Sequence, residues 1–273
     1  ESARLLLNSK SSRFPDGLAN SSGLVGKYLT DTTGLGVSGF IPKLMDHVPH
    51  NEDGVGGMHL YVPWWLEGKT RDFARGYHIE LGGGRNMPGY GFMGGIHRYP
   101  PGGGYGKQLK HDYRRYYGAT VHFAGRGEQI PNEHCWCEID PNVVDKWGIP
   151  VLRFHWKWTD QELNQAKHMQ ETFRAIIAEM GGTVFDPMPG PDREYGLARG
   201  GEIIHELGTT RMGDDPSTSV LNPYCQAHDV KNLFVADGGP FVSQADKNPT
   251  WTILALSLRT SQYIADQMKQ GAL

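Results

Sequence analysis

The sequence predicts an α/β protein, α+β overall, in which an antiparallel sheet is backed by helices. The first observation is a set of short runs that alternate apolar and polar residues, or carry β-branched and aromatic side chains, between turn signals. These runs, typical of strands, are residues 59–62, 76–81, 119–124, 135–139 and 152–158. An amphipathic helix follows them, and a strand, turn and helix lie near the end of the chain. With 273 residues, the chain is long enough for two domains.

The internal helix is expected over 160–180. Thr159 and Glu162 have the spacing of a capping box, and Gly181 supplies a stop. Its apolar positions recur at helical spacing, so we expect one helix face to pack across the sheet. A shorter helix is expected over 1–8.

The carboxyl-terminal stretch predicts a short apolar strand at 232–236, a turn at 237–239 and an amphipathic helix at 250–268. We expect Asn248 at the cap of this helix and Pro249 in its first turn. A strand followed by a glycine turn and a helix N-terminus is typical of anion-binding sites.

Charge and composition exclude several classes of partner. Lys and Arg number 27 against 30 Asp and Glu, a net charge of −3 without long runs of one sign, so we expect no nucleic acid partner. No stretch approaches about 18 consecutive apolar residues, so we expect no membrane span. Among the three cysteines, Cys135 and Cys137 fit a buried pair on one strand face better than a metal site, which needs more local ligands.

The segment 82–106 holds eleven glycines in 25 residues, with methionine and aromatic side chains interleaved. It admits two interpretations, a mobile lid over a site or a turn-rich surface excursion.

The strongest functional signal is a histidine followed by a glycine turn, in the segment 204–213 that reads Ile-His-Glu-Leu-Gly-Thr-Thr-Arg-Met-Gly. Taken alone, such a histidine is most often a hydrogen-bonded structural residue. Three further segments follow in order, at 214–220, 232–238 and 248–255. Together they closely resemble the carboxyl-terminal signature of the glucose-methanol-choline (GMC) flavoenzyme oxidoreductases. Residues 1–9 and 20–26 resemble the family's passage from its flavin domain to its substrate domain.

The resemblance implies FAD as the cofactor and two kinds of domain. Residues 1–35 and 200–273 are expected in a FAD-binding, Rossmann-like domain, and 36–199 in a substrate-binding domain with the antiparallel sheet. No Gly-x-Gly-x-x-Gly follows a strand, so we expect a missing N-terminal segment or a second chain to complete the FAD site. We therefore expect this chain, expressed alone, to be insoluble or free of FAD.

The resemblance also implies oxidation of an alcohol to a carbonyl, in which a hydride goes to flavin N5 and a base faces the hydroxyl. His205 matches the family's catalytic histidine, and imidazole with its ordinary pKa near 6.5 suits the role of base. Asn248 matches the second active-site position, where its amide would hold the substrate oxygen, although a plain helix cap is an alternative.

The implied cofactor-binding residues are grouped at the carboxyl-terminal turn and helix. Asp237, Gly238 and Gly239 resemble the turn against the ribityl and phosphate part of FAD, whereas Pro249, Thr250 and Trp251 begin the helix beside the pyrimidine edge. For Asp237 the alternative is a carboxylate bonded to its own turn. Arg211 fits a structural salt bridge as well as a cofactor contact.

The tail 245–252 is most similar to bacterial sugar dehydrogenases of the glucoside 3-dehydrogenase and gluconate dehydrogenase type. We therefore expect a sugar or glycoside substrate, oxidation at its 3-hydroxyl, a periplasmic rather than cytoplasmic location, and a cytochrome or quinone as electron acceptor. The flat side chains suited to stacking on a sugar are Tyr61, Trp64, Trp65, Trp136, Trp156 and Trp158, although core packing explains most such residues. A GMC oxidase using oxygen, or a non-catalytic carbohydrate-binding or assembly fragment, is the alternative.

Overall fold

The structure is a computed structural model that describes residues 1–45, 60–63, 71–83, 105–116 and 118–273. They divide into two compact units. The first unit comprises Glu1–Thr32, Glu128–Thr159 and Arg199–Leu273, and the second comprises Thr33–Gly127 and Asp160–Ala198. The segment Glu128–Thr159, expected in the same domain as the sheet, groups with the two ends of the chain instead.

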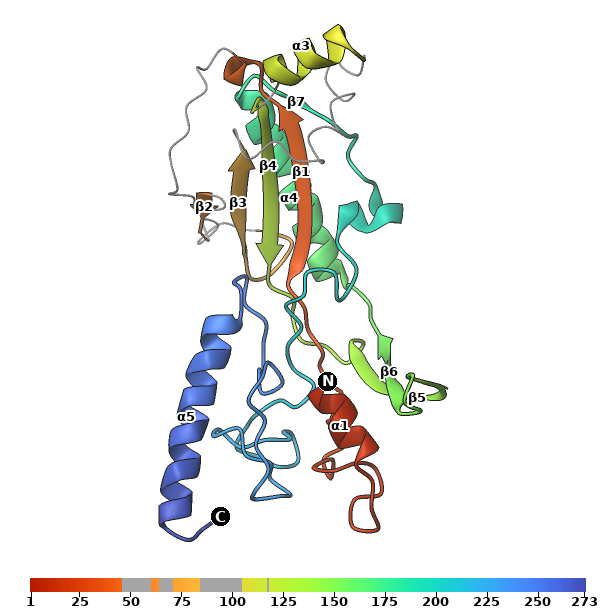
Figure 1. Ribbon diagram of the computed structural model, residues 1–273, viewed down its shortest axis with the longest axis vertical. Helices are drawn as coiled ribbons and strands as arrows, with labels where there is room; N and C mark the ends of the chain where they lie inside the picture. The colour runs from red at the N-terminus through yellow and green to blue at the C-terminus, as the bar shows by residue number, and fades with distance from the viewer. Residues whose placement is uncertain (46–59, 64–70, 84–104, 117) are drawn as a thin grey trace. The chain divides into compact units, whose positions relative to one another are not determined.

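The second unit is built on a five-stranded antiparallel sheet in the order β2-β3-β4-β1-β7. Its strands are β1 (Thr33–Phe40), β2 (Leu60–Val62), β3 (Tyr77–Gly83), β4 (Thr120–Gly127) and β7 (Thr183–Val184). Figure 1 shows β4 between β1 and β3, with α4 along one face of the sheet. The antiparallel sheet backed by a helix is thus confirmed, and β1 and β7 are strands that the sequence pattern did not indicate.

Helix α4 (Asp160–Glu179) covers one face of this sheet, as its apolar spacing predicts. Phe173 and Ile177 are fully buried on the covered face. Gly39 of β1 and Gly125 of β4 permit the close approach, since a Cβ on either would lie 2.6–2.8 Å from side chains of α4. The helix ends as expected at Gly181, whose φ of +73° lies in the left-handed region.

The opposite face of the sheet is polar, because alternate residues of β3 and β4 turn away from α4. The Glu80 carboxylate accepts a hydrogen bond from the Tyr61 hydroxyl at 3.1 Å and lies 3.2 Å from Nε2 of His78. Arg126, opposite His78 in the register, places its guanidinium 3.9 Å from the same carboxylate. His122 shares this face, and burial lowers the pKa of its imidazole. The face away from α4 therefore combines hydrogen-bond donors and acceptors with a nearly neutral charge, and His78 on it is fully buried.

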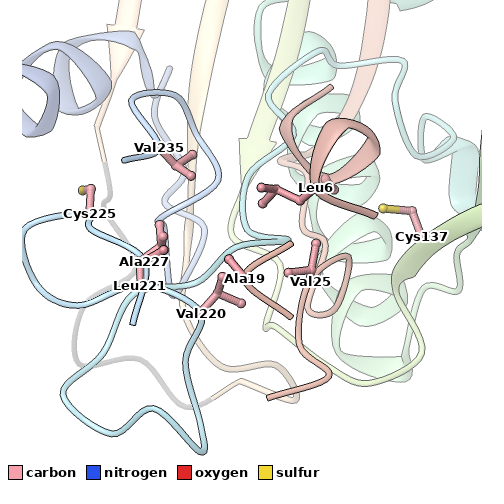
Figure 2. Packing of buried hydrophobic residues seen from close by; sticks show 10 residues of the cluster. Leu6, Ala19, Val25, Cys137, Val220, Leu221, Cys225, Ala227 and Val235 are labelled. Carbon is pink, nitrogen blue, oxygen red and sulfur yellow. The ribbon is translucent and has the colours of Figure 1, made fainter. Parts of the chain in front are cut away.

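The first unit contains α1 (Ser2–Asn8), the hairpin β5 (Trp136–Val144) and β6 (Pro150–His155), and α5 (Thr250–Lys269). Much of its remaining chain is irregular. Buried apolar side chains from distant segments hold it together, as Figure 2 shows for Leu6 of α1, Val25, Leu221, Val235 and Cys137 of β5. This core joins the start of the chain to the segment between His205 and α5.

Two expectations about the carboxyl-terminal stretch are wrong. Residues 232–236 form no strand, because Phe234 makes a single bridge to Gln226 rather than a ladder. Asn248 is not the cap of α5, since Pro249 holds that position and makes no side-chain capping bond. The turn at 237–239 and the helix after it are present as expected.

The remaining short elements are α3 (Lys107–Tyr116) and two 3-10 turns, Pro42–Leu44 and Pro191–Gly196. Most of the glycine-rich segment 82–106, and with it the choice between lid and excursion, lies outside the described residues. None of the described helices combines the length and the apolar character needed to cross a bilayer.

Candidate functional site

The site around His205 is built from three segments of the first unit that lie far apart in the sequence. The Nδ1 atom of His205 lies 3.3 Å from the Thr32 hydroxyl oxygen. The side-chain amide of Gln244 donates a 2.7 Å hydrogen bond to that same oxygen. Thr32 and Gln244 are fully buried whereas His205 is half-buried, so the ring is held from its inner side.

Asp31 fixes the main chain on both sides of this contact. Its carboxylate accepts backbone N–H bonds from Thr32 at 2.8 Å, His205 at 3.1 Å and Gly201 at 3.1 Å. Burial raises the pKa of Asp31 to about 6, and the negative charge of Glu206 acts in the same direction, whereas the three N–H donors lower it. The three N–H donors, which come from two segments of the chain, thus stabilise the charged form of a buried carboxylate.

Asn248 makes no hydrogen bond to His205 in the part of the chain that the structure describes. No hydrogen bond to the Asn248 side chain occurs among the described residues, and the residue is exposed just before α5. Its segment reaches His205 through Gln244 and Thr32 instead. The expectation that His205 and Asn248 share one substrate oxygen remains a prediction.

A cavity of about 380 Å³ lies beside this site in the first unit. The main chain of 206–209 and the turn of Asp237, Gly238 and Gly239 form part of its wall, with the start of α1, Leu29, Cys137, Leu152 and Phe154 completing it. Asp237 accepts a 2.5 Å hydrogen bond from the Ser2 hydroxyl and a 2.7 Å bond from its own turn, at the N–H of Gly239. The predicted cofactor-binding turn therefore lines a cavity.

The residues predicted at the start of α5 are accessible. Pro249 is the cap residue, Thr250 begins the helix and is exposed, and Trp251 exposes 83% of its surface. The first N–H groups of a helix lack partners within it and form its positive end.

Other candidates have structural partners. The Arg211 guanidinium lies 4.7 Å above the Tyr28 ring and makes no salt bridge among the described residues, while a cofactor contact of Arg211 stays a prediction. Trp158 is buried and packs edge-on against Trp156, as core packing predicts. Trp136 lies between the His155 ring and the Lys27 ammonium, and it belongs to the first unit rather than to the sheet.

All three cysteines are free and buried, as expected for Cys135 and Cys137, but Cys135 lies in a bend just before β5, so the two cysteines do not share a strand. Burial raises the pKa of the Cys137 thiol to about 11. Cys135 donates to the Lys157 carbonyl and accepts from the Gln129 amide, each at 3.4 Å.

The sequence analysis missed Asp31, Thr32, Gln244 and Ser2. Their partners lie more than 170 residues away, so no local spacing could reveal them. The one signal was a run of polar residues, Asp-Thr-Thr at 31–33, placed directly before a segment of strand-forming and glycine residues.

Comparison with known proteins identifies relatives of this chain. The family model described as GMC oxidoreductase matches residues 131–257. A 2-methyl-1,2-propanediol dehydrogenase of Mycolicibacterium austroafricanum is 32% identical over 269 residues, 96% of this chain and 45% of that protein. The fructose dehydrogenase large subunit of Gluconobacter japonicus is 28% identical over 271 residues, 99% of this chain and 46% of that protein. A C-glycoside 3-oxidase of Arthrobacter globiformis is 33% identical over 139 residues, 50% of this chain and 25% of that protein.

The chain spans about half the length of the first two relatives. Among solved structures, a variant of the formate oxidase from Aspergillus oryzae RIB40 superposes with a TM-score of 0.62 at 13% identity, over 98% of this chain and 53% of that one. At this identity the likeness concerns the fold alone. The family match and the relatives agree with the four motifs around His205, and the chain contains a carboxyl-terminal GMC oxidoreductase domain.

Proposed function

We propose that the protein oxidises a secondary hydroxyl of a sugar or glycoside to a ketone, with FAD as the cofactor and His205 as the general base. The observation that carries this proposal is the placement of His205. Its ring is fixed by Thr32 and its main chain by Asp31, beside a cavity walled by the predicted cofactor turn. A histidine with a purely structural role would not need both its ring and its main chain to be fixed beside a cavity.

The residues present fit the ribityl part of FAD better than its phosphates. Three acidic residues, Glu1, Glu206 and Asp237, line the cavity, and their negative charges disfavour a phosphate there. Hydroxyl groups, by contrast, donate readily to carboxylate oxygens. We therefore assign Asp237, Gly238 and Gly239 to the ribityl chain alone, and place the phosphates on residues beyond this turn.

His205 takes the hydroxyl proton of the substrate in this proposal. With its own proton on Nδ1, the ring donates to Thr32, whose oxygen has lone pairs for both His205 and Gln244. The basic lone pair is then on Nε2, the atom on the far side of the ring from Thr32. When bound, the flavin supplies the hydride acceptor for this chemistry.

Asn248 would orient the same substrate oxygen. Its amide has no hydrogen bond among the described residues, so binding a hydroxyl breaks no existing contact. Pro249, Thr250 and Trp251, at the open end of α5, are proposed to meet the flavin ring, where the helix N-terminus favours negative charge on the reduced ring.

A neutral polyol is the proposed substrate class. The 2-methyl-1,2-propanediol dehydrogenase among the relatives supports an uncharged hydroxyl compound as the substrate. The C-glycoside 3-oxidase among the relatives supports the 3-position, and the fructose dehydrogenase large subunit supports a sugar.

Two classes of electron acceptor fit the proposed function, a cytochrome or quinone partner and molecular oxygen. The dehydrogenases among the relatives support a cytochrome or quinone partner, whereas the oxidases, which include the C-glycoside 3-oxidase, support oxygen. A further N-terminal segment or second chain is proposed to complete the FAD site.

Isotopic labelling tests the reaction and the position together. The intact protein, loaded with FAD, is mixed without oxygen with methyl β-glucoside deuterated at C3, at C2 or at neither carbon. The proposal predicts bleaching of the flavin that is slowed several-fold by deuterium at C3 and unchanged by deuterium at C2. An isotope effect at C2 alone would move the oxidation site, and the absence of bleaching with every sugar and polyol would refute the function.

A further inference from the structure

Asp31 gathers three N–H donors onto one buried carboxylate. Oδ1 accepts from the main chain of Thr32 and of His205, and Oδ2 accepts from Gly201. Asp31 itself is held, because its own N–H donates a 2.9 Å bond to the buried side-chain oxygen of Gln129. The carboxylate thus joins the end of the first segment of this unit to both ends of the loop 201–205.

The loop that it holds is strained immediately before His205. Ile204 has a φ of +60°, in the left-handed region, and exposes 77% of its surface. A β-branched residue rarely adopts this conformation, which costs about 1–2 kcal/mol. Burial of the Ile204 side chain does not offset that cost, so the neighbouring contacts must maintain the conformation. The bond from the His205 N–H to Asp31 is made by the peptide that follows this residue.

We propose that Asp31 is a positioning residue for His205, whose ionised carboxylate holds the strained loop 201–205 so that the imidazole stays against Thr32. This inference rests on the proposed function of His205 as the base. Asp31 touches no reacting atom in this account and acts through the main chain of His205 alone.

The chemistry requires a carboxylate at this position. An ionised carboxylate is acceptor-only and satisfies all three N–H groups, whereas an asparagine side chain would point an N–H₂ group at one of the donors. Protonation has a similar effect, because it converts one oxygen to a hydroxyl. The charged group that acts on Asp31 is the neighbouring Glu206, whereas His205 acts on it through its backbone N–H.

The variant Asp31→Asn in the intact protein tests the inference, with Asp266→Asn as the matched control on the exposed end of α5. We expect Asp31→Asn to lower the rate of flavin reduction at saturating glycoside by about tenfold or more, with KM changed less than threefold, because a displaced base slows chemistry rather than binding. The control should retain the wild-type rate.

Amide hydrogen exchange supplies a readout that needs no turnover. In the wild type, the His205 and Gly201 amides, which donate to the Asp31 carboxylate, should be protected from exchange at neutral pH. In Asp31→Asn the same amides should be unprotected at every pH, while the buried Leu221 amide, which donates to the Arg211 carbonyl, stays protected.

The outcomes separate the inference from the function. Unchanged flavin reduction and unchanged His205 protection in Asp31→Asn would overturn the inference while leaving the function intact. If the wild type oxidises no alcohol, the proposed function fails, and exchange at His205 still decides whether Asp31 holds the loop. Loss of protection at Leu221 as well would mean that Asp31 merely supports the fold, which also overturns the inference.

Discussion

The hydroxyl oxygen of Thr32 lies 3.3 Å from Nδ1 of His205, across 173 residues of sequence. The same oxygen accepts the Gln244 amide at 2.7 Å, so one buried hydroxyl links the first segment of the unit, the histidine loop and the stretch before α5. For a histidine that acts as a base through one nitrogen, the partner of the other nitrogen sets the tautomer. In the proposed function, Thr32 accepts from Nδ1 of His205 and leaves Nε2 as the basic nitrogen.

Replacing Thr32 by valine keeps the shape of the side chain and removes this hydroxyl. We expect flavin reduction by Thr32→Val to fall about tenfold, because the ring loses its tautomer partner and Gln244 loses an acceptor. Stopped-flow absorbance measures the rate. Thr30→Val is the control, since the Thr30 hydroxyl makes only a 3.4 Å contact to the Leu207 carbonyl. Equal rates in the two variants would show that the Thr32 hydroxyl does not support the action of His205 as a base.

The raised pKa of Asp31 predicts how stability depends on pH. Burial raises this pKa from 3.8 to about 6, so between these values the folded state binds a proton that the unfolded state has released. The contribution of Asp31 to stability is fully present below about pH 4 and is lost as the pH rises through about 6. The loss is on the order of 2 kcal/mol.

Urea unfolding of the wild type and of Asp31→Asn at several pH values between about 4.5 and 7.5 checks this expectation. The free energy of unfolding of the wild type, relative to the variant, should decrease from about pH 4.5 to about 6 and level off above that. Two parallel curves would show that Asp31 does not titrate there.

Substitution of Asn248 distinguishes a role in binding the substrate from a role in capping α5. Because α5 has no side-chain cap, Asn248→Ala should leave the melting temperature within about 1 °C of the wild type, whereas loss of a true N-cap costs about 0.5–2 kcal/mol. If Asn248 orients the substrate oxygen, the same variant should lower kcat/KM for the glycoside by about tenfold or more. A destabilised variant with unchanged kcat/KM would reverse the assignment.

Asp237 offers a test of the cofactor cavity with a closely matched control. Ser2–Asp237 and Ser21–Asp229 are both serine–aspartate pairs with hydroxyl to carboxylate distances of 2.5 Å, and only the first lies on the cavity. Asp237→Asn should lower the FAD content of the purified intact protein at least severalfold. The ratio of absorbance at 450 nm to that at 280 nm, roughly the maxima of flavin and protein, measures this content. Asp229→Asn should retain its flavin, and equal losses in both variants would disconnect Asp237 from the cofactor.

The parts of the fold that the sequence predicted well are those with a strong local period. Helices α4 and α5 follow the 3.6-residue spacing of their apolar positions and begin and end close to the expected residues. Strand β1 was missed because Gly34, Gly36 and Gly39 dilute the strand signal, although Gly39 is what permits α4 to approach. Residues 232–236 look like a strand but lack a neighbour to form a ladder.

The candidate site divides in the same way. His205 and the turn at 237–239 were found through motifs that are contiguous in sequence. Asp31, Thr32 and Gln244 were not, because each acts through partners that only the folded chain brings near. Long-range hydrogen bonds leave no periodic trace in a sequence.

The most direct test of the central claim, that His205 is the base for alcohol oxidation, is the rate of anaerobic flavin reduction by saturating glycoside in His205→Ala across a range of pH. The account predicts a rate about 10²-fold or more below the wild type at neutral pH that rises with hydroxide concentration, because solvent must take the proton that the imidazole takes in the wild type. A His205→Ala protein that reduces its flavin at the wild-type rate, with the wild-type dependence on pH, would contradict it.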